Sequence, residues 1–293
     1  MSIEAGVLYV VATPLGNLGD ISERAREVLG GAGLIAAEDT RVAQRLLSHL
    51  GVRTRCISLH EHNESARVPA ILGVLGSGQA VAVISDAGTP LISDPGYRLV
   101  RAVREAGWRV SPIPGPSALI AALSASGLPT DRFVFEGFLP AKGGRRSTHL
   151  QALASETGTL VFYESSHRIA ASLADMAAVF GPDRPAAVAR ELTKRFEEIV
   201  QASLGELVGW IDGDANRRRG EFVVMVGGAP SVPESTESRV AAATVIRVLA
   251  EALPARQAAD LAASITGGAR QALYREAQKI RRQRQDDEAQ DAP

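Results

Sequence analysis

Hydrophobic residues follow two different periods along the first part of the chain. Short aliphatic runs alternate with stretches in which apolar residues recur at helical spacing. This alternation is typical of strand and helix units that build a mostly parallel sheet. It predicts strands at residues 6–12, 34–37, 56–59, 80–84 and 109–113, and helices at residues 22–29, 40–50, 64–75 and 97–106. Ser22 and Thr40 are expected to cap two of these helices, because a hydroxyl can accept a hydrogen bond from a free N–H group at a helix start.

A second block of the same kind begins near residue 133, after a proline-rich turn at residues 112–116 and a small-residue helix at residues 117–126. Its expected strands are residues 133–137, 159–163, 187–191, 197–201 and 221–226, and its expected helices are residues 145–154, 168–180 and 204–211. Residues 227–238 are rich in Pro, Ser and Gly and predict a linker. The sequence therefore predicts an N-terminal α/β domain at 1–116, a second α/β domain at 117–228 and a small helical extension at 239–283.

Composition and charge narrow the possible functions. No apolar stretch approaches the ~20 residues that a bilayer requires, and the first residues do not resemble a secretion signal, so a soluble cytoplasmic protein is expected. The single cysteine, Cys56, cannot form an internal disulfide, and His60 and His62 lack an evident third ligand, so no metal is expected. The net charge of −1 argues against a protein that binds nucleic acid over its whole surface. Any RNA contact must be local.

Four of the expected strands in the first domain run directly into a polar or glycine-rich cluster, at residues 13–18, 38–41, 60–64 and 85–96. The carboxyl ends of parallel strands meet at one edge of a sheet, where ligands of such folds bind. Each cluster alone also has a structural explanation, as a tight turn or as carboxylates at a helix start. Their coincidence at one edge predicts a shared ligand site.

The cluster at residues 85–96 is the most informative, because two Asp, two Gly and two Pro fix an irregular backbone after a buried strand. Such a loop suits a ligand that is recognised largely by main-chain groups, such as an adenosine with an amino-acid tail. A phosphate-binding glycine loop does not follow the first strand, and no G-x-S-x-G nucleophile turn is present.

Taken together, several short segments of the sequence resemble the motifs of the tetrapyrrole methylase superfamily. The matching segments are residues 10–21 (VVATPLGNLGDI), 36–41 (AAEDTR), 85–96 (SDAGTPLISDPG), 114–118 (PGPSA), 135–140 (FEGFLP), 162–165 (FYES), 190–194 (RELTK) and 220–222 (GEF). They occur in order over almost the whole chain. More narrowly, the chain resembles the bacterial branch of this family that methylates the 2′-hydroxyl of a decoding-centre cytidine in 16S rRNA. Residues 258–267, followed by Leu273 and Tyr274, are similar to a helical extension that tetrapyrrole methylases usually lack.

The resemblance implies two α/β domains that hold S-adenosylmethionine in a cleft between them, commonly in a homodimer. The cofactor-binding positions it implies are Pro14, Leu15, Asp86, Gly88, Thr89, Ile92, Ser117, Ala118, Tyr163, Leu192 and Gly220.

Attack by a ribose hydroxyl on a methyl group needs alignment and benefits from a base or a cation near the oxygen. Among the titratable residues of the matched strings, Asp39 and Lys194 are the expected catalytic groups. The expected RNA-binding residues are Arg41, Lys142, Arg145, Arg146, Arg190, Arg270, Arg275 and Lys279. Arg41 and Arg190 could equally belong to structural ion pairs.

Two other functions remain compatible with the sequence. A methylase of a porphyrin-like small molecule would use the same cleft and cofactor without a basic rim. A non-catalytic RNA-binding factor of ribosome assembly would retain the fold alone.

Overall fold

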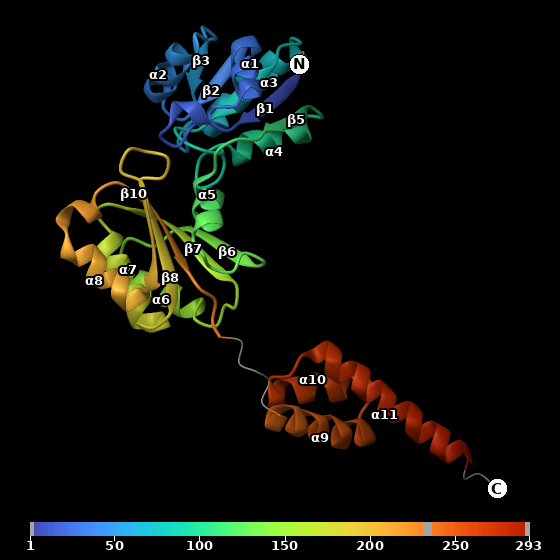
Figure 1. Cartoon of the computed structure of the whole chain (residues 1–293). Helices are drawn as coiled ribbons and strands as arrows, with labels where there is room; N and C mark the ends of the chain where they lie inside the picture. The colour runs from blue at the N-terminus through green and yellow to red at the C-terminus, as the bar shows by residue number, and fades with distance from the viewer. Residues whose placement is uncertain (1–2, 231–235, 291–293) are drawn as a thin grey trace. The chain divides into compact units, whose positions relative to one another are not determined.

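A computed structural model of the chain describes residues 3–230 and 236–290 (Figure 1). The chain divides into two compact units, Met1–Ala229 and Pro230–Pro293, each of which is described by itself. The first unit contains two five-stranded sheets, and the second consists of helices. The expected α/β fold class with a C-terminal helical extension is confirmed.

The first sheet is entirely parallel, in the order β3-β2-β4-β1-β5. Its strands are β1 (Val7–Val11), β2 (Leu34–Ala37), β3 (Cys56–Ser58), β4 (Val81–Ile84) and β5 (Arg109–Ile113). Every residue of β2 and β4 is buried, because helices cover both faces of the sheet and leave these inner strands no polar side. The strands predicted for this domain are therefore confirmed.

Helices α1 (Glu23–Gly31) and α2 (Thr40–Leu50) pack on one face of this sheet, and α3 (Glu64–Gly76) and α4 (Tyr97–Glu105) pack on the other. A short 3-10 helix, η1 (Leu18–Asp20), precedes α1. Ser22 caps α1 as expected, with its hydroxyl accepting from the N–H of Ala25. The cap expected at Thr40 is wrong by one residue: Asp39 caps α2 through its carboxylate, and Thr40 is the first helical residue.

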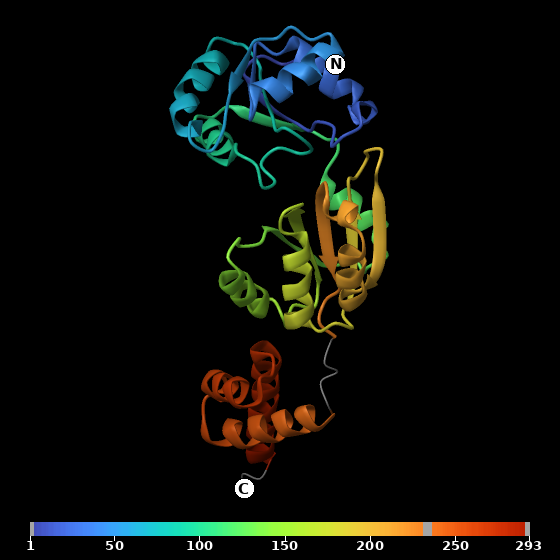
Figure 2. The ribbon, with the colours of Figure 1, turned by 90° about the vertical axis from the view of Figure 1, so that its left-hand side faces the viewer.

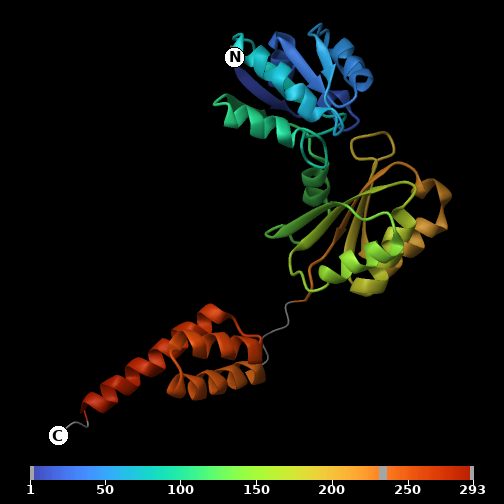
Figure 3. The same ribbon diagram turned by 180° about the vertical axis from the view of Figure 1, so that it is seen from behind.

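The second sheet is mixed, in the order β6-β7-β10-β8-β9, and only β6 and β7 run parallel. Its strands are β6 (Phe133–Phe138), β7 (Thr159–Ser165), β8 (Pro185–Arg190), β9 (Glu198–Ser203) and β10 (Glu221–Val226). Helices α6 (Gly143–Ala152), α7 (Ile169–Phe180) and α8 (Leu204–Gly213) supply the core on one face, and α5 (Ala118–Ala125) packs on the other (Figure 3). A 3-10 helix, η2 (Ala215–Arg218), precedes β10.

The described residues of the second unit form three helices, α9 (Thr236–Ala252), α10 (Ala255–Thr266) and α11 (Arg270–Gln290), around a small core of their own (Figure 2). Residues 231–235 of the expected linker lie outside the described residues. The domain limits expected at residues 116 and 228 stay predictions. Within the described part of the chain, no helix combines the length and the apolar character needed to cross a bilayer.

Candidate active site

A cleft of about 390 Å³ lies where the carboxyl ends of the first sheet's strands face the second sheet. The first domain contributes residues that follow β1, β2, β4 and β5, and the second contributes residues from β6, β7, β8 and β10. The residues on which the site is built are Leu15, Glu38, Asp86, Gly88, Thr89, Ile92, Asp94, Ser117, Ala118, Phe138, Tyr163, Leu192 and Glu221. This edge of the sheet is the one at which the sequence predicts a ligand site, and three of the four predicted clusters contribute to the cleft, whereas residues 60–64 do not line it.

Backbone hydrogen bonds tie the loop after β4 to the loop after β1. Thr13 and Gly88 exchange N–H to carbonyl bonds in both directions, at 2.9 and 3.0 Å. Gly88 has a φ of +79°, which a residue with a Cβ adopts only at a cost. The hydroxyl of Thr89 donates to the carbonyl of Pro116 at 2.9 Å, which also ties the loop to the start of α5. Three segments of the cleft wall are thus held in fixed positions.

Two apolar lining residues sit between pairs of residues with unusual backbone conformations. In the part of the chain that is described, only Leu91, Ser93, Glu191 and Thr193 combine a side chain with a positive φ. They flank Ile92 and Leu192, one in each wall of the cleft. Such conformations cost free energy and persist where the surroundings impose them, often at functional sites.

Three carboxyl groups line the first-domain side of the cleft, and the pKa of each is raised above its ordinary value. Burial and then the charge of Glu38 raise the pKa of Asp94 from its ordinary 3.8 to about 6. Burial also raises the pKa of Glu38 and of Asp86, and Asp86 adds to the rise at Glu38. The backbone N–H of Asp39 donates to Asp86 at 3.0 Å, which partly offsets the rise at Asp86. The cleft wall therefore favours a positively charged ligand.

Aromatic side chains form the opposite wall. The ring of Tyr163 packs edge-on against Phe135 and Phe138, with centroids 4.8 and 5.7 Å away. Its hydroxyl accepts a hydrogen bond from the N–H of Leu119 in α5 at 3.2 Å. Burial raises the pKa of Tyr163, so its hydroxyl stays protonated at neutral pH. Phe138 is 53% exposed and leaves an apolar surface open to a ligand.

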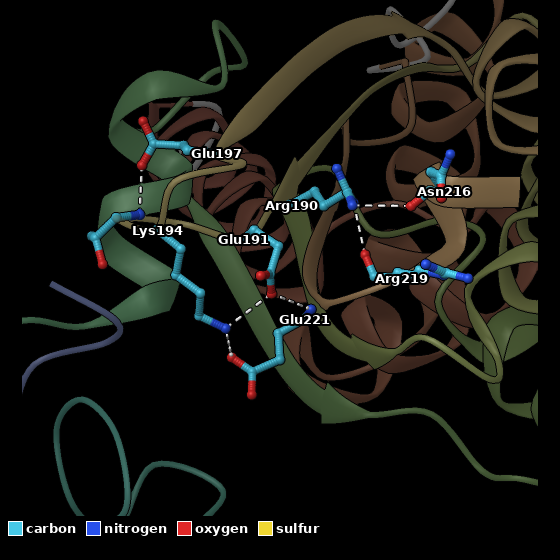
Figure 4. A network of polar contacts seen from close by, with 8 residues as sticks. Arg190, Glu191, Lys194, Glu197, Asn216, Arg219 and Glu221 are labelled. Carbon is cyan, nitrogen blue, oxygen red and sulfur yellow. Dashed lines mark hydrogen bonds and ion pairs between the residues drawn. The ribbon is translucent and has the colours of Figure 1, made fainter. Parts of the chain in front are cut away.

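Lys194 lies beside the cleft in a network of carboxylates (Figure 4). Its ammonium is 2.9 Å from Glu191 Oε1 and 2.9 Å from Glu221 Oε2, and Glu221 lines the cleft. Burial lowers the pKa of Lys194, but these two partners outweigh it and the pKa is raised overall. The stem of Lys194 also passes against the loop after β1, where a Cβ on Gly16 would lie 2.3 Å from its Cγ. Lys194 is therefore a fixed cation between the two walls.

Asp39, the other expected catalytic group, does not line the cleft. Its carboxylate caps α2 by accepting from the N–H of Arg41 at 2.8 Å, and it pairs with the guanidinium of Arg41 at 2.6 Å. The side-chain hydrogen bond from Arg41 holds the pKa of Asp39 at about 2. A carboxylate with such a low pKa is a weak proton acceptor.

The structure brings most of the expected cofactor positions together. All of them line the cleft except Pro14 and Gly220, whose neighbours Leu15 and Glu221 do. Gly220 has a φ of +104° and lies against Glu191, where a Cβ would be 2.6 Å from its Oε1. Pro14 is buried directly before the lining residue Leu15.

The expected RNA-binding residues lie in very different surroundings. Arg146 is only 6% exposed and its Nε pairs with Asp175 at 2.7 Å, so the burial of its side chain disfavours the predicted contact with RNA. The side chain of Arg190 is 13% exposed and donates to the carbonyls of Arg219 and Asn216 at 2.7 and 2.9 Å (Figure 4). Arg190 thus anchors the segment before β10.

The other expected RNA-binding residues are accessible. Lys142 and Arg145 are exposed at the start of α6. In the second unit, Arg270 pairs with Asp260 and lines a small pocket with Tyr274, whereas Arg275 and Lys279 are exposed along α11. Arg41 is exposed despite its pairing with Asp39.

The sequence did not predict three of the residues that line the cleft, Asp94, Phe138 and Glu221. Each of them lies within a segment that matches the family motifs. For Asp94 a signal was present, because it is the second Asp of the loop 85–96. The position of Phe138 and Glu221 depends on how the second sheet faces the first, for which the local sequence carries no signal.

Comparison with protein families finds a match to the model of tetrapyrrole (corrin/porphyrin) methylases over residues 7–208. The model of the RsmI C-terminal HTH domain matches residues 236–281, which include all of α9 and α10 and the first part of α11.

Among curated proteins, the chain is 53% identical over 271 residues to a protein of Xylella fastidiosa (strain Temecula1) named ribosomal RNA small subunit methyltransferase I, covering 92% of this chain and 98% of the relative. It is 52% identical over 270 residues to a protein of the same name from Escherichia coli O157:H7, covering 92% and 94%.

Two solved structures share the fold. The methyltransferase CobJ aligns with a TM-score of 0.58 at 21% identity, over 77% of this chain and 95% of that one. Uroporphyrin-III-C-methyltransferase from Thermus thermophilus aligns with a TM-score of 0.55 at 21% identity, over 76% and 94%.

Proposed function

The chain belongs to the tetrapyrrole methylase family, and from this premise we propose that it methylates the ribose 2′-hydroxyl of a cytidine in 16S rRNA of the small ribosomal subunit. It is a methyltransferase that uses S-adenosylmethionine and acts on small-subunit ribosomal RNA. The cytidine and the ribose oxygen are the finer part of the proposal. They rest on the resemblance of the motif strings and of residues 258–267.

The observation that carries the proposal is the acidic cleft with apolar walls. S-adenosylmethionine, when bound, supplies a methyl group on a positively charged sulfur. The carboxyl groups of Glu38, Asp86 and Asp94 offer the opposite charge on one side of the cleft. Apolar side chains such as Ile92 and Leu192 offer a surface for an adenine ring. The residues present therefore fit this cofactor in charge and in shape.

Asp94 is the residue of the cleft best suited to remove the proton from the ribose hydroxyl. A general base is most effective when its pKa lies near the working pH, and the pKa of Asp94 is about 6. Asp39 is less suited, because Arg41 holds its pKa at about 2 and it does not line the cleft. We therefore propose Asp94 as the base, and the sequence-based prediction of Asp39 is tested beside it.

Lys194 suits electrostatic stabilisation rather than proton removal. Its raised pKa keeps it charged at neutral pH, and Glu191 and Glu221 hold its ammonium at the rim of the cleft. A fixed cation near a developing alkoxide lowers the barrier without reorganisation during the reaction. In the proposal, the enzyme works as a cytoplasmic homodimer, which light scattering of the purified protein tests.

The central experiment is single-turnover methylation of small ribosomal subunits purified from cells that lack this chain. Isotope-labelled S-adenosylmethionine is the donor, and digestion to nucleosides followed by mass spectrometry locates the methyl group. We expect label on a ribose of cytidine, and no label when the subunits are first treated with RNase. Label on a base, or on a porphyrin but not on subunits, would contradict the proposal.

Two variants connect this activity to the cleft. Asp86→Ala is expected to weaken S-adenosylmethionine binding in isothermal titration by at least about tenfold, because a negative charge that lines the cleft is lost. Lys142→Ala, which changes an exposed residue away from the cleft lining, is the control for cofactor binding. Wild-type affinity in Asp86→Ala would remove this residue from the cofactor site.

A further inference from the structure

An open groove of about 800 Å³ runs along α2, on the face of the first sheet that α1 and α2 cover. One side is formed by Arg41, Gln44, Arg45 and Ser48, which follow one another at helical spacing along α2. The other side is formed by Thr54 and Arg55 at the entry to the edge strand β3. The groove is distinct from the cleft in its lining residues.

The groove carries an unbalanced positive charge. Three arginines line it, and its lining contains no Asp or Glu side chain. Arg41 pairs with Asp39, whereas Arg45 and Arg55 make no ion pair with any residue that the structure describes. In a chain with a net charge of −1, two unpaired arginines in one polar groove favour an anion of extended shape.

A short segment joins the groove to the cleft. Glu38 lines the cleft, Thr40 and Arg41 line the groove, and Asp39 lies between them. The N–H of Asp39 donates to Asp86 of the cleft at 3.0 Å, and its carboxylate holds Arg41 at 2.6 Å. The two sites are thus neighbours in a fixed arrangement.

The cleft is lined by carboxyl groups and the groove by arginines, so the two sites favour ligands of opposite charge. The carboxyl groups of the cleft favour a cationic cofactor but repel phosphate groups. A nucleotide whose ribose enters the cleft remains bonded to phosphates on both sides, and these need cations outside the cleft. Arg45 lies in α2, which follows the cleft-lining end of β2, and Arg55 lines the same groove at the entry to β3.

We propose that this groove binds the sugar-phosphate backbone of the RNA strand next to the methylated nucleotide. The inference rests on the proposed function and adds Arg45 and Arg55 as phosphate-binding residues. Gln44, Ser48 and Thr54 supply neutral hydrogen-bonding groups of the kind that contact phosphate and sugar oxygens. Such contacts fix the register of the strand rather than reading its bases.

The test uses the full chain with the double substitution Arg45→Ala and Arg55→Ala. Its matched control is Arg67→Ala with Arg104→Ala, which removes the same charge from exposed positions on α3 and α4, on the opposite face of the sheet. Binding to unmethylated small subunits is measured over a series of salt concentrations. Isothermal titration of S-adenosylmethionine and single-turnover methylation are measured for both variants.

Each phosphate contact releases counterions, so loss of two contacts lowers the slope of log affinity against log salt by about 1.4 to 1.8. We expect this change, a loss of subunit affinity of roughly tenfold or more at 0.1 M salt, and unchanged cofactor affinity. The control variant keeps the wild-type slope.

Equal slopes and affinities in the two double variants would overturn the groove proposal while leaving methylation by the wild-type enzyme intact. If the groove variant instead changes the mass of the protein in solution and not its salt slope, the groove is an interface between copies of the chain. Failure of the wild-type enzyme to methylate subunits would reject the proposed function itself, so the two failures are distinguishable.

Discussion

Asp94 shows what an individual residue in this structure gains from its surroundings. The sequence marks the loop 85–96 as a ligand loop by its Asp, Gly and Pro content. It does not reveal that Asp94 is half-buried near Glu38, because Glu38 follows β2 whereas Asp94 follows β4. The same holds for Arg146, which looks like surface charge in sequence and is buried against Asp175. Burial and pairing of this kind are set by tertiary contacts and not by local pattern.

Substitution of Asp94 by Asn is expected to stabilise the protein without cofactor, with a gain that grows from about pH 4 and is complete above about pH 6. In the folded state the pKa of Asp94 is about 6, above its ordinary 3.8, so folding loses stability as the pH rises from about 4 to 6. Removal of the charge should recover roughly 1–2 kcal/mol at pH 8, after allowance for solvent screening. Thermal melts at pH 8 and pH 4 check this, and an equal gain at both pH values would argue against it.

The rate of methyl transfer should depend on the same ionisation. Below about pH 6 Asp94 becomes protonated and no longer accepts a proton, so the single-turnover rate should fall about tenfold per pH unit. Asp94→Asn should lose most of the activity at every pH, whereas Asp39→Asn should retain the wild-type profile. A normal rate in Asp94→Asn together with inactivity of Asp39→Asn would reverse the assignment.

Thr193 combines two local costs, since a β-branched residue adopts a φ of 64° and its buried hydroxyl has no hydrogen-bond partner. Thr193→Gly is therefore expected to stabilise the fold by about 1 kcal/mol while weakening cofactor binding, because Leu192 is held less firmly. Thr193→Ala, which removes the hydroxyl and the γ-methyl but keeps the Cβ at a positive φ, separates the cost of the buried hydroxyl from that of the backbone. Chemical denaturation and cofactor titration measure them, and destabilisation by Gly would refute the interpretation.

At the scale of helices, strands and loops, the sequence was most informative about features that depend on residues within one element. The buried runs of β2 and β4 and the cap at Ser22 follow from residue pattern and hydrogen-bonding capacity. The cap at Asp39 was missed because Thr40 and Asp39 are both good caps, and the choice depends on the backbone angles of each residue. Loop contacts such as that of Gly16 with Lys194 join segments far apart in the chain.

Gly16→Ala should disturb the loop after β1 and Lys194 together. The new Cβ would lie 2.3 Å from Lys194 Cγ, so Lys194 must leave its position between Glu191 and Glu221. We expect weaker cofactor binding and a slower reaction. In a Lys194→Ala background the same substitution should have little further effect, and a double-mutant cycle measures this coupling. Additive effects of the two changes would show that Gly16 does not act through Lys194.

At the scale of the molecule, the order of domains and the count of strands were evident from the sequence, but the direction of strands in the second sheet was not. Only β6 and β7 are parallel there, whereas the pairs β7–β10, β10–β8 and β8–β9 are antiparallel. The arrangement of the cleft depends on this sheet, since β7 and β10 carry Tyr163 and Glu221 into it. Residues of the second wall were therefore harder to predict than those of the first.

The separate core of α9, α10 and α11 predicts that the two units act independently in cofactor binding. A shortened chain ending at Ala229 should bind S-adenosylmethionine with nearly wild-type affinity, because every cleft residue lies before that point. Its methylation of subunits should fall through a higher KM. Titration and steady-state kinetics test both parts, and loss of cofactor binding would show that the helical unit supports the cleft.

The paired left-handed residues around Ile92 and Leu192 carry a consequence for how this enzyme can vary over evolution. Each loop turns its apolar residue inward only because both flanking positions are set, so insertion or deletion of a single residue would rotate that side chain out of the cleft. These two loops should therefore keep constant length among relatives while their surface residues change freely.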